Sequence, residues 1–491
     1  MGKLRVGVLM GGKSIEKEVA FNSGRTVCDH LDTARYTIVP LFQHQTGSLY
    51  VLPWRFLHRG KITDFEHRLE QEAQLIGWND LKQYIDFMYI ALHGRYAEDG
   101  ILQGFLQVLG IPYLGSKVLS SALSMDKIVQ KQFLRSYTIA VANDVTIYPH
   151  ELTYYTQNTQ ALYNRLEQAH ITYPCIVKPH NEGSSLGISV VHTKDTLITA
   201  LHTAAKINPK KPQAVLIEEY LTGLEFSCII LTDYNTQDYI PLPPTQIVTE
   251  PNTWLFDYRQ KYMPGQATKF TPARCDTATL CAIQKTCVEV MKILGIHNLA
   301  RIDGFVTPDQ RIVITDPNTF SGMAPSSFIS VQAAHSNMSH TRLINHLIET
   351  ELVYYNMHTL LDTPLTSSPE HTPEHAHEYT QTTTPEKKLR VAVLLGGRSH
   401  EREISLESGR NIFYKLSPHN YTPLVIFVSS TLELYLIDQK LLVKNATYEI
   451  EQDLDPASKI TWDDLKTIAD FVFIGLHGGE GENGCVQGAL L

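Results

Sequence analysis

The sequence lacks any long apolar segment, any paired cysteine motif and any excess of positive charge. In 491 residues there is no run of 18 uncharged apolar residues, about the length that a membrane-spanning helix needs. The seven cysteines are odd in number and scattered, with no Cys-x-x-Cys, so neither a disulfide framework nor a zinc knuckle is indicated. The formal net charge of -9 gives no overall basic surface. We therefore expect a cytoplasmic protein with no nucleic-acid or membrane partner, long enough for several hydrophobic cores.

A dinucleotide-binding fingerprint is also missing, although the chain opens like a βα unit. The apolar run 4–10 leads into two adjacent glycines and a segment of helical character, but no later G-x-x-G follows. Glu16 lies at the start of this helix, where it would either face a ligand amine or complement the helix dipole. Apolar runs at 87–92 and 111–116 predict further strands. Residues 1–126 therefore read as an open α/β domain with its ligand loops at one edge.

The segment 176–190 carries the clearest binding signal. Two apolar, β-branched runs flank a polar turn with glycines, a pattern that predicts a hairpin whose loop offers N–H groups and hydroxyls to an anion. Lys178, on the strand that leads into the turn, would supply a point charge to a phosphate. A surface hairpin with a solvated lysine is the alternative. Lys127, early in a predicted helix, is either a solvated lysine or a second cation for a triphosphate.

Acidic residues recur downstream in an order that suits a nucleotide and a metal ion. The apolar strand 214–221 ends in carboxylates, which could take the ribose hydroxyls beside an adenine pocket, but without further context an ordinary strand end is favoured. Two later strands are predicted to pair antiparallel, and alternation places Arg301 and Asp303 on one face of the first strand, and Asp316 and Asn318 on one face of the second. Two carboxylates and an amide oxygen suit Mg²⁺. Phosphoryl transfer needs such charge neutralisation together with a lysine and an arginine.

Taken together, these motifs resemble the D-alanine–D-alanine ligases of the ATP-grasp superfamily. The resemblance is carried by Gly11-Gly12-x-Ser14-x-Glu16, Leu92-His93-Gly94-Arg95, Ser124-Met125-Asp126-Lys127, Glu182-Gly183-Ser184-Ser185-x-Gly187, Arg301-Ile302-Asp303 and Asn318-Thr319. It implies a mixed α/β fold, built as a three-domain ATP-grasp module. The implied domains are an N-terminal substrate-binding domain at 1–126, a central ATP-grasp subdomain at 127–230, and a C-terminal metal and substrate subdomain at 231–362.

The resemblance also implies the members of the active site. Catalytic roles fall to Glu16, Ser184, Tyr262, Arg301 and Gly322. Substrate contacts fall to His93, Ser327 and Phe328. ATP contacts fall to Lys127, Lys178, Glu182, Ser185, Glu218, Tyr220, Leu221, Glu225 and Lys261. Metal contacts fall to Asp303, Asp316 and Asn318.

Among these residues, the family pattern gives Glu16 the ammonium group of the first D-alanine. Arg301 and the backbone N–H of Gly322 would stabilise the oxyanion of the tetrahedral intermediate. Ser184 and Tyr262 would join Glu16 in a hydrogen-bond network that closes a loop over the site and keeps water out.

The implied reaction joins two D-alanines through an acyl phosphate, for peptidoglycan precursor synthesis. It uses ATP with Mg²⁺ or Mn²⁺, two ions in all, and such ligases commonly form homodimers. Tyr262 predicts D-alanine rather than D-lactate as the second substrate. Another ATP-grasp carboxylate–amine ligase, or a catalytically degenerate nucleotide-binding or regulatory homologue, is the alternative.

Two positions depart from the family pattern. The second metal position, normally glutamate, is Asp316, whose side chain is one methylene shorter. In addition, Phe320-Ser321 replaces the small residue and proline that usually precede the glycine at Gly322. We therefore expect an active but impaired module.

A partial repeat follows the ligase-like module. Residues 363–387 are rich in Thr, Pro, His and Glu and predict a disordered linker. Residues 389–403 then repeat the opening strand and turn, and 476–488 repeat the loop that follows His93. The span 388–491 is thus interpreted as a second, partial N-terminal ligase domain that cannot transfer phosphoryl groups by itself. A fragment of a tandem ligase is favoured over a vestigial or regulatory domain.

Overall fold

The computed structural model describes residues 3–58, 60–183, 186–207, 212–249, 267–360, 388–416 and 421–490. The chain forms two compact units, Met1–Met338 with Arg342–Leu360, and Ser339–Thr341 with Leu361–Leu491. Within the described ranges, no helix has both the length and the apolar character needed to cross a bilayer.

The first sheet of the larger unit is the open α/β sheet predicted for the N-terminal part. Its elements are β1 (Leu4–Gly11), α1 (Lys17–His30), β2 (Tyr36–Gln43), β3 (Leu49–Val51), α2 (Trp54–Leu57), α3 (Leu69–Glu72), β4 (Gln74–Ile76), α4 (Leu81–Tyr84), β5 (Phe87–Ile90), α5 (Ile101–Leu109) and α6 (Val118–Met125). The strand order is β4-β3-β2-β1-β5. β1 runs parallel to both β2 and β5, so the carboxyl ends of these strands share one edge, as the βα reading requires.

Helix α1 approaches β1 closely because the sequence provides a glycine at the contact. A side chain at Gly24 would collide with Met10 on β1. The strand predicted at 111–116 is reduced to one bridge between Tyr113 and Met88. Main-chain bonds from Met88 N to Pro112 O and from Leu114 N to Met88 O, both 2.9 Å, still cover the outer edge of β5. The prediction of a full strand there was wrong, since Pro112 has no N–H to extend the ladder.

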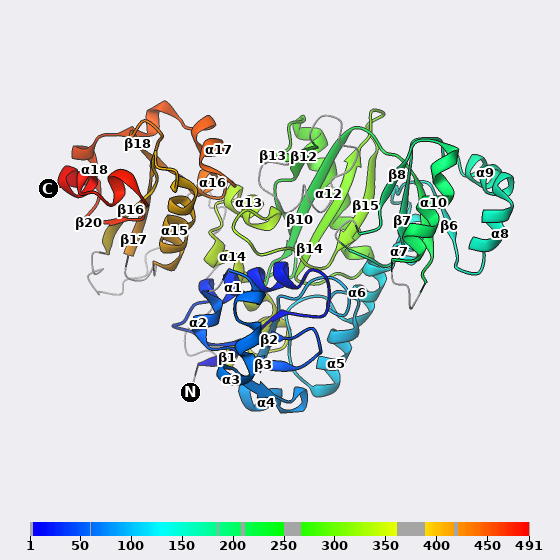
Figure 1. Ribbon diagram of the computed structural model, residues 1–491, viewed down its shortest axis with the longest axis horizontal. Helices are drawn as coiled ribbons and strands as arrows, with labels where there is room; N and C mark the ends of the chain where they lie inside the picture. Colours follow the sequence, from blue (N-terminus) through cyan, green and yellow to red (C-terminus); the bar gives the residue numbers. More distant parts are fainter. Residues whose placement is uncertain are drawn as a thin grey trace. The chain divides into compact units, whose positions relative to one another are not determined.

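The second sheet contains the predicted hairpin. Its elements are α7 (Lys127–Ser136), β6 (Asp144–Ile147), α8 (Leu152–Gln157), α9 (Thr159–Gln168), β7 (Cys175–Pro179), β8 (Ser189–Val191), α10 (Lys194–Ala205) and β9 (Val215–Glu219). The order is β6-β9-β7-β8, and β7 and β8 pair antiparallel from Cys175↔Val191 to Val177↔Ser189, which confirms the hairpin. One face of this sheet packs on α9 and α10 through a core that includes Leu162, Val177 and Leu201 (Figure 1).

The third sheet carries the later acidic strands. Its elements are β10 (Leu224–Thr232), β11 (Tyr239–Pro241), β12 (Thr245–Thr249), β13 (Ala267–Phe270), α12 (Thr277–Ile293), β14 (Leu299–Val306), β15 (Ile312–Asn318), α13 (Phe328–His335) and α14 (His340–Tyr354). The order is β13-β12-β10-β14-β15, with β11 on β10. Helix α12 lies across this sheet (Figure 1), and its Cys287 and Met291 share a core with Phe226 and Ile302. The antiparallel pairing of β14 with β15 was predicted.

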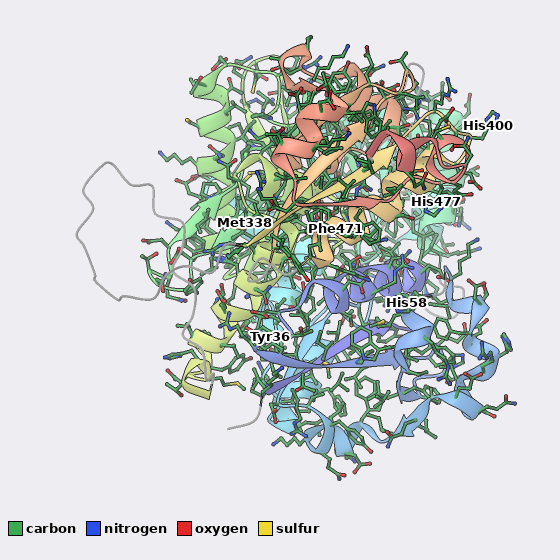
Figure 2. The ribbon with its side chains drawn as sticks, turned by 90° about the vertical axis from the view of Figure 1, so that its left-hand side faces the viewer. Tyr36, His58, Met338, His400, Phe471 and His477 are labelled. Atoms are coloured by element: carbon green, nitrogen blue, oxygen red, sulfur yellow. The ribbon has the colours of Figure 1, made fainter. Side chains whose placement is uncertain are left out.

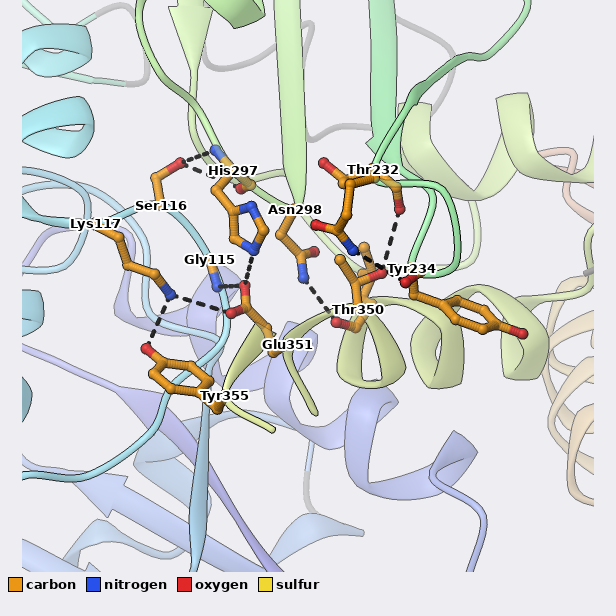
Figure 3. A network of polar contacts seen from close by, with 12 residues as sticks. Gly115, Ser116, Lys117, Thr232, Tyr234, His297, Asn298, Thr350, Glu351 and Tyr355 are labelled. Atoms are coloured by element: carbon orange, nitrogen blue, oxygen red, sulfur yellow. Dashed lines mark hydrogen bonds and ion pairs between the residues drawn. The ribbon is translucent and has the colours of Figure 1, made fainter. Parts of the chain in front are cut away.

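A buried carboxylate on α14 connects the first and third sheets. Glu351 is fully buried and accepts a hydrogen bond of 2.9 Å from the backbone N–H of Gly115 (Figure 3). Lys117 Nζ lies 3.1 Å from Glu351 Oε2. His297 Nε2 lies 3.5 Å from Glu351 Oε1, the oxygen that also accepts from Gly115. Lys117 Nζ also donates to Tyr355 OH at 2.9 Å. Because a buried charge is costly without partners, these contacts fix the first sheet against the strands that carry the predicted metal and oxyanion residues.

The smaller unit repeats the first sheet. Its elements are β16 (Leu389–Gly396), α15 (Arg402–Lys415), β17 (Tyr421–Val428), β18 (Leu434–Ile437), α16 (Gln439–Leu442), α17 (Thr447–Gln452), β19 (Lys459–Ile460), α18 (Trp462–Ile468), β20 (Phe471–Ile474) and α19 (Cys485–Leu490). The strand order β19-β18-β17-β16-β20 corresponds to β4-β3-β2-β1-β5 of the first sheet. Even the close helix contact recurs, because a side chain at Gly409 on α15 would collide with Leu395 on β16. The predicted duplication is therefore confirmed at the level of the fold.

The two copies differ at one edge of the sheet. Val6 and Val391 hold equivalent positions opposite Phe87 and Phe471, respectively. Phe87 is fully buried, whereas Phe471 on β20 (Figure 2) is 58% exposed. Among residues 388–416 and 421–490, no second strand pairs with β20. An exposed apolar edge strand of this kind promotes association.

We expect the double substitution Phe471→Lys and Phe473→Lys to reduce the binding of a hydrophobic dye such as anilinonaphthalene sulfonate by the full chain. Phe473 is 41% exposed, so neither change empties a packed core. Tyr448→Lys, at a residue that is 48% exposed on α17, is the matched control and should leave dye binding near the unchanged level. Equal fluorescence in both variants would show that the β20 edge does not bind the dye.

Candidate active site

The loops after β1 and β5 build a rigid cradle around Glu16. Ser14 Oγ donates to the carbonyl of His93 at 2.7 Å and accepts from the backbone N–H of Glu16 at 3.1 Å. His93 Nε2 lies 3.0 Å from Ser23 Oγ on α1. Glu16 is only 8% exposed, and its carboxylate lies so close to Gly94 that a side chain there would collide with it. The predicted residues Glu16 and His93 are thus brought together, and the cradle presents a buried carboxylate suited to an ammonium group.

The hairpin turn of the second sheet meets this cradle. An added Cβ at Gly183 would lie 3.4 Å from Glu16 Oε2, so the hairpin turn lies next to the Glu16 carboxylate. Next to it, Glu182 Oε1 lies 3.4 Å from Arg95 NH1 and accepts from Gln213 Nε2 at 3.0 Å. The carbonyl of Glu182 also accepts from Lys127 Nζ at 3.1 Å. Glu182 therefore connects the N-terminal loop, the hairpin and the first predicted phosphate lysine.

The second predicted phosphate lysine lies in a buried ionic cluster. Lys178 Nζ is 2.9 Å from Glu218 Oε2, and Lys131 Nζ on α7 donates to Glu218 Oε1 at 2.6 Å. Burial alone would raise the pKa of the Glu218 carboxyl, but the two ammonium groups outweigh it and lower this pKa to about 2. Burial pulls the pKa of Lys178 down, yet the charge of Glu218 raises it above the usual value. Lys178 therefore carries positive charge at the base of the hairpin, whereas burial outweighs the charge of Glu218 at Lys131 and lowers the pKa of that lysine.

The predicted adenosine residues follow directly along the chain. Tyr220 and Leu221 form the short connection between β9 and β10, and Glu225 lies near the start of β10; all three are half-buried. Burial and the charge of Glu225 raise the pKa of the Tyr220 hydroxyl, which therefore stays neutral. A half-buried connection with an aromatic ring and a carboxylate fits an adenine and ribose pocket.

The predicted metal residues face one another across β14 and β15. Arg301 pairs with Asn318 and Asp303 with Asp316 in the strand register, so all four side chains lie on one face. Asp303 Oδ1 accepts from Ser227 Oγ at 2.7 Å, and Arg301 NH2 lies 3.3 Å from Asp303 Oδ2. Asp316 Oδ1 is 3.3 Å from Lys127 Nζ. This last contact connects the acidic pair to the predicted phosphate lysine on α7.

These donors fit a hard divalent cation. The amide nitrogen of Asn318 donates to the carbonyls of Arg301 at 3.4 Å and of Asp316 at 2.9 Å, which leaves its Oδ1 as the ligating atom. Two carboxylates and one amide oxygen are the ligands that Mg²⁺ prefers. No group of three His, Cys, Asp or Glu residues suited to a metal occurs in the described part of the chain. The register shifts between Asp303 and Gly304, which the sequence did not predict.

The loop after β15 lies against the cradle. The backbone N–H of Met323 donates to Ser23 Oγ at 3.2 Å, so this loop and the His93 loop share one hydroxyl. An added Cβ at Gly322 would meet no atom within 4 Å, so open space adjoins this residue. Phe320, at one of the positions that depart from the family pattern, is only 4% exposed and packs on Gly115. The bulky Phe320 side chain is thus buried where the loop after β15 meets Gly115.

The remaining predicted residues divide into two groups. Ser327 and Phe328 begin helix α13, where Ser327 Oγ lies 3.1 Å from Ser330 Oγ and Lys269 Nζ lies 4.9 Å from the centre of the Phe328 ring. The other group lies outside the described residues: Ser184, Ser185, Lys261 and Tyr262. Lys131 and Ser23 were not predicted, although Lys131 stands four residues after Lys127 and so on the same face of its helix.

Comparisons with known proteins find one family of ligases along most of the chain. A family model for the C-terminus of D-ala D-ala ligases matches residues 133–349, and one for the N-terminus matches both 5–116 and 390–491. The chain is 32% identical over 358 residues to a D-alanine–D-alanine ligase of Natranaerobius thermophilus, covering 71% of this chain and 94% of that protein.

Solved structures give the same result. The VanG D-Ala:D-Ser ligase of Enterococcus faecalis has a TM-score of 0.61 at 27% identity, covering 71% of this chain and all (100%) of that one. The Bacillus anthracis D-alanine–D-alanine ligase complexed with ATP has a TM-score of 0.54 at 28% identity, covering 72% and 99%.

The fold and these matches together define the class as an ATP-grasp carboxylate–amine ligase. The chain belongs to the D-alanine–D-alanine ligase family. Its second copy matches the N-terminal family model alone, as the predicted partial repeat requires.

Proposed function

We propose that the module within residues 1–362 joins two D-alanines into D-alanyl-D-alanine at the expense of ATP, for peptidoglycan precursor synthesis. The observation that carries this proposal is the continuous set of contacts from Glu16 through the Gly183 turn and Glu182 to Lys127 and Asp316. In this proposal, Glu16 binds the ammonium group of a substrate, the lysines bind phosphate and the two carboxylates bind the cation, and these contacts support a single shared site.

In the first half-reaction, the carboxylate of the first D-alanine attacks the γ-phosphorus of ATP, and ADP leaves. Glu16 holds the ammonium group of this D-alanine, while Lys127 and Lys178 hold phosphate oxygens. The lysines neutralise charge on the transferred group, which is the main requirement of phosphoryl transfer. Asp303, Asp316 and Asn318 would hold Mg²⁺ or Mn²⁺, which supplies further charge neutralisation when bound.

In the second half-reaction, the amine of the second D-alanine attacks the acyl carbon and inorganic phosphate leaves. Arg301 and the backbone N–H of Gly322 stabilise the oxyanion that forms at this carbon. Ser327 and Phe328 contact the second D-alanine. The roles of Ser184, Ser185, Lys261 and Tyr262, the cytoplasmic location and a homodimer stay predictions.

The test is phosphate release by the purified full chain with ATP and Mg²⁺, with and without D-alanine, combined with mass analysis of the product. We expect D-alanine-dependent phosphate release matched by an equal amount of dipeptide. D-Serine and D-lactate, offered as competing acceptors, should be used less well than D-alanine. ATP binding without turnover would point to the degenerate homologue, and preference for a different amine would point to another ligase.

Substitution of Asp316 by glutamate is expected to raise turnover, up to about 10-fold, because the longer side chain brings its carboxylate nearer to the cation. The measurement is kcat as a function of Mg²⁺ concentration, with a lower Mg²⁺ requirement expected in the variant. Asp309→Glu changes the same group on the exposed connection between β14 and β15 and should leave both quantities unchanged. No gain from Asp316→Glu would show that the shorter residue does not limit this enzyme.

A further inference from the structure

The ionic cluster under the hairpin contains a lysine to which the proposed reaction assigns no role. Lys131 is 3% exposed and lies one helical turn after Lys127 on α7. Its Nζ donates to Glu218 Oε1 at 2.6 Å and lies 3.7 Å from Asp144 Oδ1. Such complete burial of an ammonium group is costly in free energy, and the two carboxylates offset this cost.

The sheet register explains why these groups meet. Glu218 on β9 lies opposite Asp144 on β6 and Ile176 on β7, and Lys178 lies opposite Leu216. Directly opposed residues share a face of a sheet, so Asp144, Lys178 and Glu218 all point toward the face that α7 covers. Lys131, on this helix, contacts the same Glu218 carboxylate that Lys178 contacts.

Glu218 is therefore shared between two lysines that differ in their surroundings. One carboxylate oxygen is held by Lys131 and the other lies 2.9 Å from Lys178 Nζ. Lys178 stands at the end of β7, directly before the hairpin turn, where the proposed function places a phosphate. Lys131 belongs to the helix behind the sheet, and its Nζ is enclosed by carboxylates.

We propose that Lys131 is a positioning residue for nucleotide binding, which acts by holding Glu218 so that Lys178 can turn from Glu218 to a phosphate. When Lys178 moves to a phosphate, Glu218 would be left as a buried charge without a cation if Lys131 were absent. With Lys131 in place, Glu218 keeps one strong ionic hydrogen bond throughout. This inference rests on the proposed binding of phosphate by Lys178.

Removal of the Lys131 charge should therefore weaken nucleotide binding more than catalysis. In a Lys131→Met variant, Lys178 is the one close cation left to Glu218 among the described residues, and the two stay paired when nucleotide arrives. We expect the Kd for ADP with Mg²⁺ to rise about 10- to 100-fold, with a similar rise in the KM for ATP. The kcat at saturating ATP should change less than about threefold, since Lys131 contacts no reacting atom.

A double-mutant cycle with Glu218→Gln separates positioning from a purely structural role. In the Glu218→Gln background Lys178 has lost the carboxylate that lies 2.9 Å from its Nζ, so Lys131→Met should alter the Kd for ADP by less than about threefold. Arg135→Met is the matched control on the same helix, because Arg135 contacts Asp144 but not Glu218 and is 40% exposed. This control should bind ADP like the unsubstituted chain.

The experiment is isothermal titration of the full chain and its variants with ADP and Mg²⁺, with the fold checked by circular dichroism. A large effect of Lys131→Met that disappears in the Glu218→Gln background supports the inference. An equal effect of Lys131→Met in both backgrounds, or no effect in either, overturns the inference. If Lys131→Met alone does not fold, the charge-balanced double variant with Lys131→Met and Glu218→Gln is compared with Glu218→Gln alone. An unsubstituted chain that binds no ADP would instead contradict the proposed function.

Discussion

Replacing Arg301 with methionine is expected to lower the kcat for dipeptide formation by about 100- to 1000-fold. The guanidinium group lies beside Asp303, at 3.3 Å, on the strand face that carries all the predicted metal ligands. Its charge would oppose the negative charge that develops on the acyl oxygen when the second amine attacks. Methionine keeps much of the side-chain volume but removes this charge. The measurement is steady-state dipeptide formation at saturating ATP and D-alanine.

The binding of nucleotide provides the internal control for Arg301. We expect the Kd for ADP to stay within about threefold of the unsubstituted chain, because the phosphate lysines lie on other elements. Arg311→Met removes the same group from the exposed start of the neighbouring strand, where it pairs with Asp309. Arg311→Met should not alter kcat. Equal losses in the Arg301 and Arg311 variants would show that the effect comes from the stability of the strand pair.

Replacing Glu16 with glutamine is expected to lower kcat/KM for D-alanine about 100-fold. Glu16 is 8% exposed and is enclosed by the glycines of two loops, so an ammonium group bound there would lose a buried ionic partner. Glutamine is almost isosteric and preserves the cradle, which makes loss of charge the main change. The measurement is the dependence of phosphate release on D-alanine concentration.

The second copy supplies a matched control for Glu16. Glu401 begins helix α15 as Glu16 begins α1, and Ser399 Oγ accepts from its backbone N–H at 3.1 Å, as Ser14 does from Glu16. Glu401 is nevertheless exposed. Glu401→Gln should therefore leave kcat/KM unchanged. A loss in the Glu401 variant comparable with that of Glu16→Gln would show that the second copy takes part in the reaction.

Local patterns predicted those parts of the site that lie on single strands or on adjacent ones. Alternation along two strands was sufficient to place Arg301 with Asp303 and Asp316 with Asn318, because side chains of a strand point to opposite faces in turn. The hairpin that carries Lys178 was also predicted, since β-branched runs around a glycine-rich turn have few other solutions. The register shift after Asp303 was not, because it depends on the pairing of the two strands.

Interactions between distant elements could not be read from the sequence. The pairing of Lys131 with Glu218 joins a helix to a strand 87 residues later. The network around Glu351 joins the N-terminal loop to the last helix of the module across 236 residues. No local pattern reports such contacts, because each residue alone resembles an ordinary surface charge. The exposure of Phe471 could not be predicted either, because Phe87, at the equivalent position of the first copy, is fully buried.

The central claim is that the carboxylate of D-alanine is phosphorylated and then displaced by an amine, and isotope transfer tests it most directly. The full chain is incubated with ATP, Mg²⁺ and D-alanine labelled with ¹⁸O in both carboxylate oxygens, and the products are analysed by mass. Attack of the carboxylate on phosphorus predicts one ¹⁸O in each released phosphate and three in each dipeptide. Phosphate without ¹⁸O would show that ATP is hydrolysed by water, and would contradict the proposed ligase reaction.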